Sequence, residues 1–185
     1  MHECRGLRKV HLETGYTDNI EVMHCVLYPD PEYPIPIFGA DIVATPTVVT
    51  AAIADISPVY KTDKIYKKLG KLANKYEFKE KRPLPEWADI FSPYCQFMRL
   101  RNDEEKSLYG CMIEEFIDFY VDIVKKAKKD TNWVNTMLRF DDQIHYCKQQ
   151  RKNKKTKAVL SKWFSPEFAE GYINDILFDV PPIPK

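Results

Sequence analysis

Between residues 7 and 58 the sequence repeatedly sets an ionisable side chain inside an apolar run that is rich in β-branched residues. These runs are Val10–Glu13, Val22–Val26 and Phe38–Val43. Runs of this kind are typical of β-strands. Because side chains two apart in a strand share one face, His11 and Glu13 should point the same way. The chain is therefore expected to fold around a sheet that carries titratable groups on one face.

The first two runs are expected to form a hairpin. Gly15 and Asp18 favour a turn over residues 14–19. Leu7–Glu13 and Ile20–Tyr28 should then pair as antiparallel strands on either side of this turn. The position of the turn decides which side chains of the two strands face each other.

Four ionisable side chains are expected to meet on one face of this sheet. With the turn centred at residues 17 and 18, His11 lies opposite His24, and Glu13 lies close by on the same face. Asp41 lies in the next apolar run. A lone His or Glu on a strand is usually a surface group or a satisfied core group, because burying it unpaired costs on the order of several kcal/mol. Four such groups in neighbouring strands favour a proton-handling site instead, because such sites work by mutual perturbation of pKa values.

The rest of the chain predicts strands first and helices later. A proline-rich connection over 28–36 leads to strands at Ile37–Ala44 and Val48–Ile56, with a hairpin turn at 45–46, and to a strand at Phe91–Leu100. The apolar spacing predicts helices at Lys61–Tyr76, Glu104–Lys129, Phe140–Leu160 and Pro166–Leu177. This order favours an α+β fold, in which helices cover an antiparallel sheet. No repeat or boundary divides residues 1–185, so one domain is expected.

Composition narrows the classes of function. The net charge is +1, which gives no global field for nucleic acid or for a membrane surface. No apolar run approaches the roughly 18 residues of a membrane span, and the first residues lack the apolar core of a signal peptide. The five cysteines show no Cys-x-x-Cys spacing, so we expect reduced thiols and no metal site. The basic run over 148–157 has no aromatic stacking motif beside it. RNA binding by this run is therefore a weaker alternative to the docking of an acidic protein.

Consecutive blocks of the sequence resemble the ferredoxin-dependent bilin reductases. The blocks are Leu7–Glu13, Val22–Pro29, Pro36–Val43, Ala51–Pro58, Arg82–Trp87, Ile90–Ser92, Gln143–Cys147, Gln149–Gln150, Asn153, Lys155–Thr156 and Leu177–Val180. They cover nearly the whole chain in order, which is more specific than any single motif. The resemblance implies a three-layer α/β/α sandwich whose central antiparallel sheet is flanked by helices, with the bilin between the sheet and the C-terminal helices. It also implies that the chain lacks the family's N-terminal segment, as a compact natural variant or by truncation, so that an edge or face of the sheet is exposed.

By the resemblance, the chain reduces biliverdin IXα to phycocyanobilin with single electrons from reduced ferredoxin. No tightly bound cofactor is implied, and the sequence has no Gly-rich dinucleotide fingerprint and no phosphate loop. The protein must then supply protons in step with the electrons. The implied partners are biliverdin and a weakly docked ferredoxin, which either basic run, 61–71 or 148–157, is suited to receive. A monomer is expected, in the cytoplasm of a cyanobacterium or a phage-infected host, or in a plastid stroma.

The resemblance also implies catalytic roles for the four titratable residues. Asp41 would protonate the bilin near its pyrrole nitrogens and lactam oxygens. His24 would hydrogen-bond the lactam end and share a proton relay with His11. Glu13 would serve the exocyclic vinyl group, and desolvation inside its apolar run should favour the protonated form. His24 and Glu13 together favour the phycocyanobilin-forming branch, because members that make phycoerythrobilin typically carry Asn at the position of His24.

Four further residues are expected to bind the substrate. Arg82 and Lys155 match the positions that hold the propionates, and a guanidinium suits a carboxylate; Thr50 and Asn153 are the other two. The sequence departs from the family at Lys154, where Asp is commoner, and at residues 47–50, which replace a turn containing Gly-Gly. Two alternatives stay open: a related reductase that gives phycoerythrobilin or dihydrobiliverdin, and a shortened homologue that binds bilin without turnover.

Overall fold

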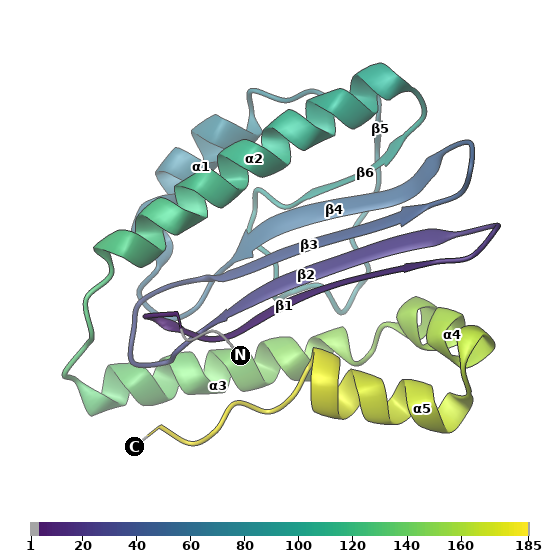
Figure 1. Cartoon of the computed structure of the whole chain (residues 1–185). Coiled ribbons are helices and arrows are strands. Elements are labelled where there is room, and N and C mark those ends of the chain that lie inside the picture. The colour runs from purple at the N-terminus through teal and green to yellow at the C-terminus, as the bar shows by residue number, and fades with distance from the viewer. Residues whose placement is uncertain (1–3, 185) are drawn as a thin grey trace.

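The computed structural model describes residues 4–184, and over these residues six strands form one antiparallel sheet (Figure 1). The strands are β1 Leu7–Tyr16, β2 Glu21–Pro29, β3 Ile37–Ala44, β4 Val49–Ser57, β5 Glu80–Lys81 and β6 Gln96–Leu100. Their order across the sheet is β1-β2-β3-β4-β6-β5. The first four strands are therefore a meander, in which each strand pairs with the next one along the chain.

Helices cover both faces of the sheet (Figure 1). A 3₁₀ turn, η1 Asp63–Ile65, leads into α1 Tyr66–Ala73, which shares one face with α2 Asp103–Lys126. The other face carries α3 Trp133–Gln150, α4 Lys154–Trp163, α5 Pro166–Gly171 and the π-helical segment η2 Tyr172–Leu177. The predicted α+β fold, a three-layer α/β/α sandwich, is confirmed. None of the helices within residues 4–184 combines the length and apolar character that crossing a bilayer requires.

Each face of the sheet has its own hydrophobic core. The core under α1 and α2 includes Phe38, Ala40, Ala54, Leu69, Met112 and Phe116. The core under α3 and η2 includes Val26, Tyr28, Ile37, Tyr146, Cys147 and Leu177. Ile37 and Phe38 are neighbours in β3 and enter opposite cores, as the alternation of a strand requires. The second core fills only part of its face, and the remainder is the cavity described below.

Polar side chains cap the helices and correct two predicted boundaries. Asn132 accepts a hydrogen bond from the backbone of Asn135 and opens α3, and Asn153 accepts one from Lys155 and opens α4. The predicted single helix over Phe140–Leu160 was therefore wrong, because it begins earlier and breaks at 151–153. Residues 133–139 of this helix were not predicted, because Trp133 and Val134 at its start are exposed and give no core-facing stripe.

The strand predicted over Phe91–Leu100 was too long. Only Gln96–Leu100 pairs with β4. Upstream, the backbone N–H and the hydroxyl of Ser92 donate to the carboxylate of Asp55. Pro93 has no N–H to offer a sheet, so residues 91–95 form a loop instead.

The register of the first hairpin also differs from the prediction. The turn is centred at residues 18 and 19, and the Thr17 N–H donates to the carbonyl of Ile20. Glu13 therefore lies opposite His24, and His11 lies opposite Val26. A shift of two residues leaves every side chain on its predicted face, because the side-chain period of a strand is two.

β1 forms one edge of the sheet, and an exposed edge was expected. The side chains that it presents away from the cavity include Val10, Leu12 and Tyr16, which are 57%, 66% and 83% exposed. The opposite edge strand, β5, has only two residues. The longer and more apolar of the two edges is thus β1.

Candidate functional site

Three titratable side chains form a line across the sheet. Glu13 of β1 pairs with His24 of β2, and His24 pairs in turn with Asp41 of β3. We call Glu13, His24 and Asp41 the titratable row. The same line continues into the apolar residues Ile53 of β4 and Phe97 of β6. Directly paired residues of adjacent strands lie close enough for their side chains to interact, so the meander itself brings these groups together.

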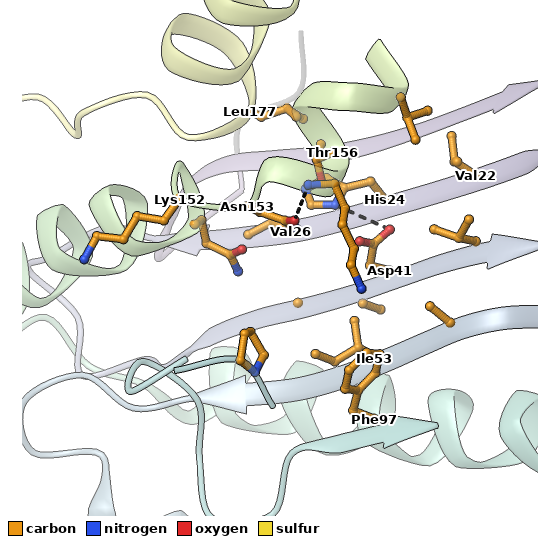
Figure 2. A pocket seen from close by; sticks show the side chains of 18 of the residues that line it. Val22, His24, Val26, Asp41, Ile53, Phe97, Lys152, Asn153, Thr156 and Leu177 are labelled. Atoms are coloured by element: carbon orange, nitrogen blue, oxygen red, sulfur yellow. Dashed lines mark hydrogen bonds and ion pairs between the residues drawn. The ribbon is translucent and has the colours of Figure 1, made fainter. Parts of the chain in front are cut away.

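The predicted quartet is completed by His11, which lies two residues before Glu13. His11 Nε2 is 3.4 Å from Glu13 Oε2, and His24 Nδ1 is 3.9 Å from Asp41 Oδ1. The two imidazole rings lie edge to face, 5.9 Å apart. Figure 2 shows His24 and Asp41 pointing toward each other from neighbouring strands. Each imidazole thus has a carboxylate partner, which offsets the cost of placing these groups in a half-buried site.

Glu13 differs from the prediction in its protonation. Burial raises the pKa of Glu13. Contacts with His11 and with the hydroxyl of Tyr172, together with the nearby His24, lower it by more than burial raises it. The pKa therefore lies below the ordinary value. Desolvation acts in the expected direction, but the surrounding donors and imidazoles outweigh it, so the net direction of the pKa differs from the expectation. The sequence did not predict the contribution of Tyr172, whose hydroxyl donates a hydrogen bond to the Glu13 carboxylate.

The titratable row lies on the floor of a cavity of about 930 Å³. Cavities of this size suit a small-molecule ligand. Its floor is the sheet, with Gly39 and Ile53 beside the titratable row. One wall is the segment 82–87 with Phe91, and the other wall is α4, through Lys155, Thr156, Val159, Leu160 and Trp163. The lining is mostly apolar, with titratable groups at the floor and cations on both walls.

Gly39 lets an α3 side chain approach the floor closely. A Cβ at this position would lie 3.2 Å from the hydroxyl of Tyr146. Tyr146 lines the cavity, and its hydroxyl accepts a hydrogen bond from Gln150 at 3.0 Å. A side chain in place of Gly39 would require the Tyr146 hydroxyl to shift.

Seven of the eight predicted site residues line this cavity. His11 is the exception, since it is not among the lining residues and contacts Glu13 and His24 instead. Arg82 donates to the backbone carbonyl of Thr50 at 2.8 Å, and its guanidinium lies over the ring of Phe97 at 5.1 Å. Arg82 is therefore fixed in orientation before any ligand arrives.

The other wall supplies cations and an amide. Lys152, Lys154 and Lys155 all line the cavity, together with Asn153. The side-chain oxygen of Asn153 caps α4, which leaves its amide nitrogen to face a ligand. Figure 2 shows Lys152 pointing away from His24 and Asp41. Lys154 thus adds a further cation to this wall.

Asp55 is a third carboxylate of this sheet face, one that sequence analysis did not select. It lies in β4, is 1% exposed, and accepts hydrogen bonds from Ser57 at 2.7 Å and from the Ser92 backbone at 2.8 Å. Burial raises the pKa of Asp55 despite these hydrogen bonds. It carried the signal that identified Asp41, an ionisable residue inside an apolar β-run.

Aromatic contacts complete the surroundings of His24. Phe178 meets the His24 ring edge to face at 5.7 Å, and His24 Nε2 is buried with no hydrogen-bond partner in the described chain. A buried nitrogen of this kind is a natural contact for a ligand or a water molecule. Among residues 4–184 no group of three or more His, Cys, Asp or Glu side chains could hold a metal ion.

Comparisons with known proteins identify the relatives of this chain. The sequence profile of the ferredoxin-dependent bilin reductase family matches residues 1–179. The phycocyanobilin:ferredoxin oxidoreductase of Synechococcus sp. strain CC9902 is 40% identical over 188 residues, which cover 100% of this chain and 76% of that protein. The protein of the same name from Prochlorococcus marinus strain MIT 9303 is 42% identical over 185 residues, covering 98% of this chain and 70% of that one.

A solved structure shows the same fold. Tomato phytochromobilin synthase, solved in complex with biliverdin, superposes with a TM-score of 0.76 at 19% sequence identity. The match covers 92% of this chain and 66% of the tomato chain. At that identity the likeness concerns the fold, which is the three-layer sandwich described above.

Proposed function

The chain belongs to the ferredoxin-dependent bilin reductase family and is by that membership a ferredoxin-dependent oxidoreductase, and from this premise we propose that it reduces biliverdin IXα to phycocyanobilin. The reaction takes four electrons and four protons in total. Ferredoxin supplies the electrons one at a time, and the protein supplies the protons. We further propose that residues 1–185 act as one domain and as a monomer, in the cytoplasm of a cyanobacterium or a phage-infected host, or in a plastid stroma; the cyanobacterial sources of the relatives support the first of these settings.

The titratable row is the observation that carries this proposal. Glu13, His24 and Asp41 lie side by side on the floor of an otherwise apolar cavity, where a large planar tetrapyrrole would lie flat against the sheet. Proton donors placed along one line can serve different positions of an extended substrate without its moving. Their shared environment also keeps proton transfer between them short.

Asp41 is assigned the first protonation. It is the member of the row nearest the middle of the sheet, and its carboxyl group faces the cavity beside His24. A carboxylic acid there gives its proton to a ring nitrogen or a lactam oxygen of the reduced bilin. His24 then restores the proton, and His11 behind it connects the pair toward Glu13.

Glu13 is assigned the exocyclic vinyl group. Because its pKa lies below the ordinary value, Glu13 is held ionised and must take up a proton before it can donate one. The imidazoles of His11 and His24 are adjacent sources of that proton. The vinyl group is therefore reduced only when the relay is charged, which separates the two stages of the reaction.

The cations of the two walls are assigned to the propionates. Arg82 is held by Thr50 and Phe97 on one side, and Lys155 lies on the other. A preoriented guanidinium can bind a carboxylate through two parallel hydrogen bonds. Lys154 adds a further positive charge to the same wall and strengthens attraction to a dianionic substrate.

Ferredoxin is proposed to dock on the α3 side of the molecule. The basic run of α1 packs against the face of the sheet that lies away from the cavity, so an electron arriving there must cross the sheet. Lys148 and Lys152, at the end of α3, are exposed on the same side as the cavity. An acidic protein docked there has the shorter path to the substrate.

Anaerobic turnover tests the proposed function. Biliverdin is incubated with the protein, ferredoxin and a reductant, and the products are separated by chromatography against known bilins. The expected product is phycocyanobilin. Accumulation of phycoerythrobilin or dihydrobiliverdin would assign the chain to a different branch, and unchanged bound biliverdin would contradict catalysis altogether.

A further inference from the structure

Glu13 has one contact outside the sheet, and it comes from the far end of the chain. The hydroxyl of Tyr172 donates to Glu13 Oε2 across 159 residues of sequence. Tyr172 is the first residue of the π-helical segment η2. π-Helical turns are rare in proteins and are frequently found at functional sites.

An aromatic column fixes where this hydroxyl lies. The ring of Tyr172 stacks on Phe168 of α5 at 5.5 Å, with an interplanar angle of 11°. Phe168 packs in turn against Phe164, which closes the end of α4, at 4.5 Å. The Tyr172 hydroxyl is therefore positioned by the hairpin formed by α4 and α5.

The same hairpin forms a wall of the cavity. α4 has no fully buried residue. Its apolar side chains Val159, Leu160 and Trp163 line the cavity, and Leu160 also packs against the edge of the second core. Among the helices and strands α4 packs mainly against α5. Its seating therefore depends on what fills the cavity, and a change in that seating reaches Tyr172 through the aromatic column.

We propose that Tyr172 is a positioning residue that holds the Glu13 carboxylate as a hydrogen-bond acceptor, and that it links the seating of the α4–α5 hairpin to the readiness of Glu13 to donate a proton. The first half of this inference rests on contacts alone. The second half rests on the proposed function, in which Glu13 serves the vinyl group.

The electrostatic surroundings of Glu13 are consistent with such a hold. His11 and His24 face it from the sheet, Tyr172 faces it from η2, and Lys154 and Lys155 line the same cavity from α4. The hydrogen bond from Tyr172 is one of the causes that lower the pKa of Glu13. Losing it must raise that pKa, because a hydroxyl donor stabilises the ionised carboxylate more than the neutral acid.

The test uses Tyr172→Phe, which removes the hydroxyl and keeps the stacked ring. Carboxyl-carbon NMR of protein labelled at its glutamates follows the titration of Glu13 without ligand, with Glu13→Gln identifying the signal. The midpoint should move to higher pH in Tyr172→Phe. Tyr16→Phe is the matched control, since Tyr16 ends the same strand with its ring 83% exposed, and its midpoint should equal that of the unmodified protein. An unmoved midpoint in Tyr172→Phe overturns the proposal.

A second variant tests the link to the hairpin. Phe168→Leu keeps the Tyr172 hydroxyl but removes the stacked ring beneath it. The Glu13 midpoint should move in the same direction by a smaller amount. If Phe168→Leu titrates like the unmodified protein, the aromatic column does not position Tyr172, and the link to α4 is refuted.

Turnover separates this inference from the proposed function. In Tyr172→Phe, the pH at which vinyl reduction is half-maximal should rise by the same shift as the Glu13 midpoint. If the midpoint rises and the pH profile does not follow, Glu13 is not the vinyl donor, and the coupling to proton delivery is overturned. The hold of Tyr172 on Glu13 would still stand in that case, since the titration establishes it alone.

Discussion

Two carboxylates of the same sheet face have pKa values moved in opposite directions. Burial raises the pKa of Glu13, but His11, Tyr172 and His24 together lower it by more, so the pKa lies below its usual value. Asp55 receives only neutral donors in complete burial, which leaves its pKa raised. Groups whose pKa values are pushed apart in this way are suited to different tasks in acid–base chemistry. In the proposed mechanism Glu13 exchanges a proton with the substrate, whereas Asp55 holds the loop at Ser92 through hydrogen bonds.

Replacing Glu13 by Gln should separate the two stages of reduction. The amide keeps the shape and hydrogen bonding of Glu13 but cannot donate a proton. Vinyl reduction should fall by on the order of 10²-fold or more, as expected for loss of a general acid, while reduction of the A ring continues. Chromatography of the products should show an A-ring-reduced bilin whose D-ring vinyl is intact. Normal phycocyanobilin formation by this variant would remove Glu13 from the mechanism.

Replacing Asp55 by Asn should change how stability depends on pH. The raised pKa means that the folded protein binds this proton more tightly than the unfolded chain, whose value is near 3.8. Asp55 therefore stabilises the fold increasingly as pH falls through the folded-state pKa toward that value, and the benefit is absent at neutral pH. The free energy of unfolding of the unmodified protein, minus that of Asp55→Asn, should rise on acidification from neutral pH.

Urea unfolding at a series of pH values measures this difference. Asp118→Asn, an exposed position on α2, controls for the loss of one carboxylate. If this difference in free energy stays constant or shrinks on acidification, burial does not raise the pKa of Asp55 in the folded protein.

At the scale of elements, α3 and α4 of the C-terminal layer differ in how they are held in place. α3 is anchored by Arg139, which is fully buried and donates to the carbonyl of Pro31 at 2.7 Å and to Asp130 at 3.1 Å. α4 has no buried residue and depends on the cavity and on α5. α3 thus carries Tyr146 to the floor of the cavity, and α4 forms one of the cavity walls.

Charge reversal at the end of α3 tests the docking of ferredoxin. Lys148→Glu with Lys152→Glu should lower turnover at low salt by about 10-fold or more, and weaken its dependence on ionic strength, because electrostatic steering is lost. Arg151 is left unchanged, since it donates to the carbonyls of Phe178 and Asn174 and holds the end of η2.

Saturating biliverdin isolates the docking step from substrate binding in this experiment. Lys67→Glu with Lys71→Glu on α1 is the matched control, with the same change of charge on the opposite layer. If the α1 pair alters the salt profile and the α3 pair does not, ferredoxin docks across the sheet from the cavity.

The elements differ in how far sequence predicted them. β3 and β4 were predicted to within one residue, because each is an apolar run bounded by turn residues. The start of α3, residues 133–139, was not predicted because its first apolar side chains, Trp133 and Val134, face solvent. The break before α4 is marked in the sequence by a single capping residue, Asn153. Asn is also common in loops, so this residue alone does not predict where a helix begins.

The site was predictable where it depends on strand periodicity. The face occupied by Glu13 and Asp41 follows from a period of two and survives a register error of two residues. Tyr172 could not be predicted, because its contact with Glu13 depends on how the last helices fold back on the sheet. The direction of the Glu13 pKa was mistaken for the same reason, since sequence shows the burial and not the donor.

At the scale of the whole molecule, the sheet separates a fully packed layer of helices from a layer that encloses a cavity. The layer of α1 and α2 packs on the sheet over a continuous core and supports the strands from behind. The layer of α3, α4, α5 and η2 shares its face of the sheet with the cavity. The proposed substrate binding, proton delivery and docking of ferredoxin thus all fall on one side of the sheet.

The central claim is that the titratable row delivers the protons for bilin reduction, and Asp41→Asn tests it most directly. The variant keeps the cavity and the cations of its walls, so it should bind biliverdin like the unmodified protein in an absorbance titration. On anaerobic addition of reduced ferredoxin it should take up an electron and stall, with a bilin radical visible by electron paramagnetic resonance and no phycocyanobilin released. Full conversion of biliverdin to phycocyanobilin by Asp41→Asn would contradict the account.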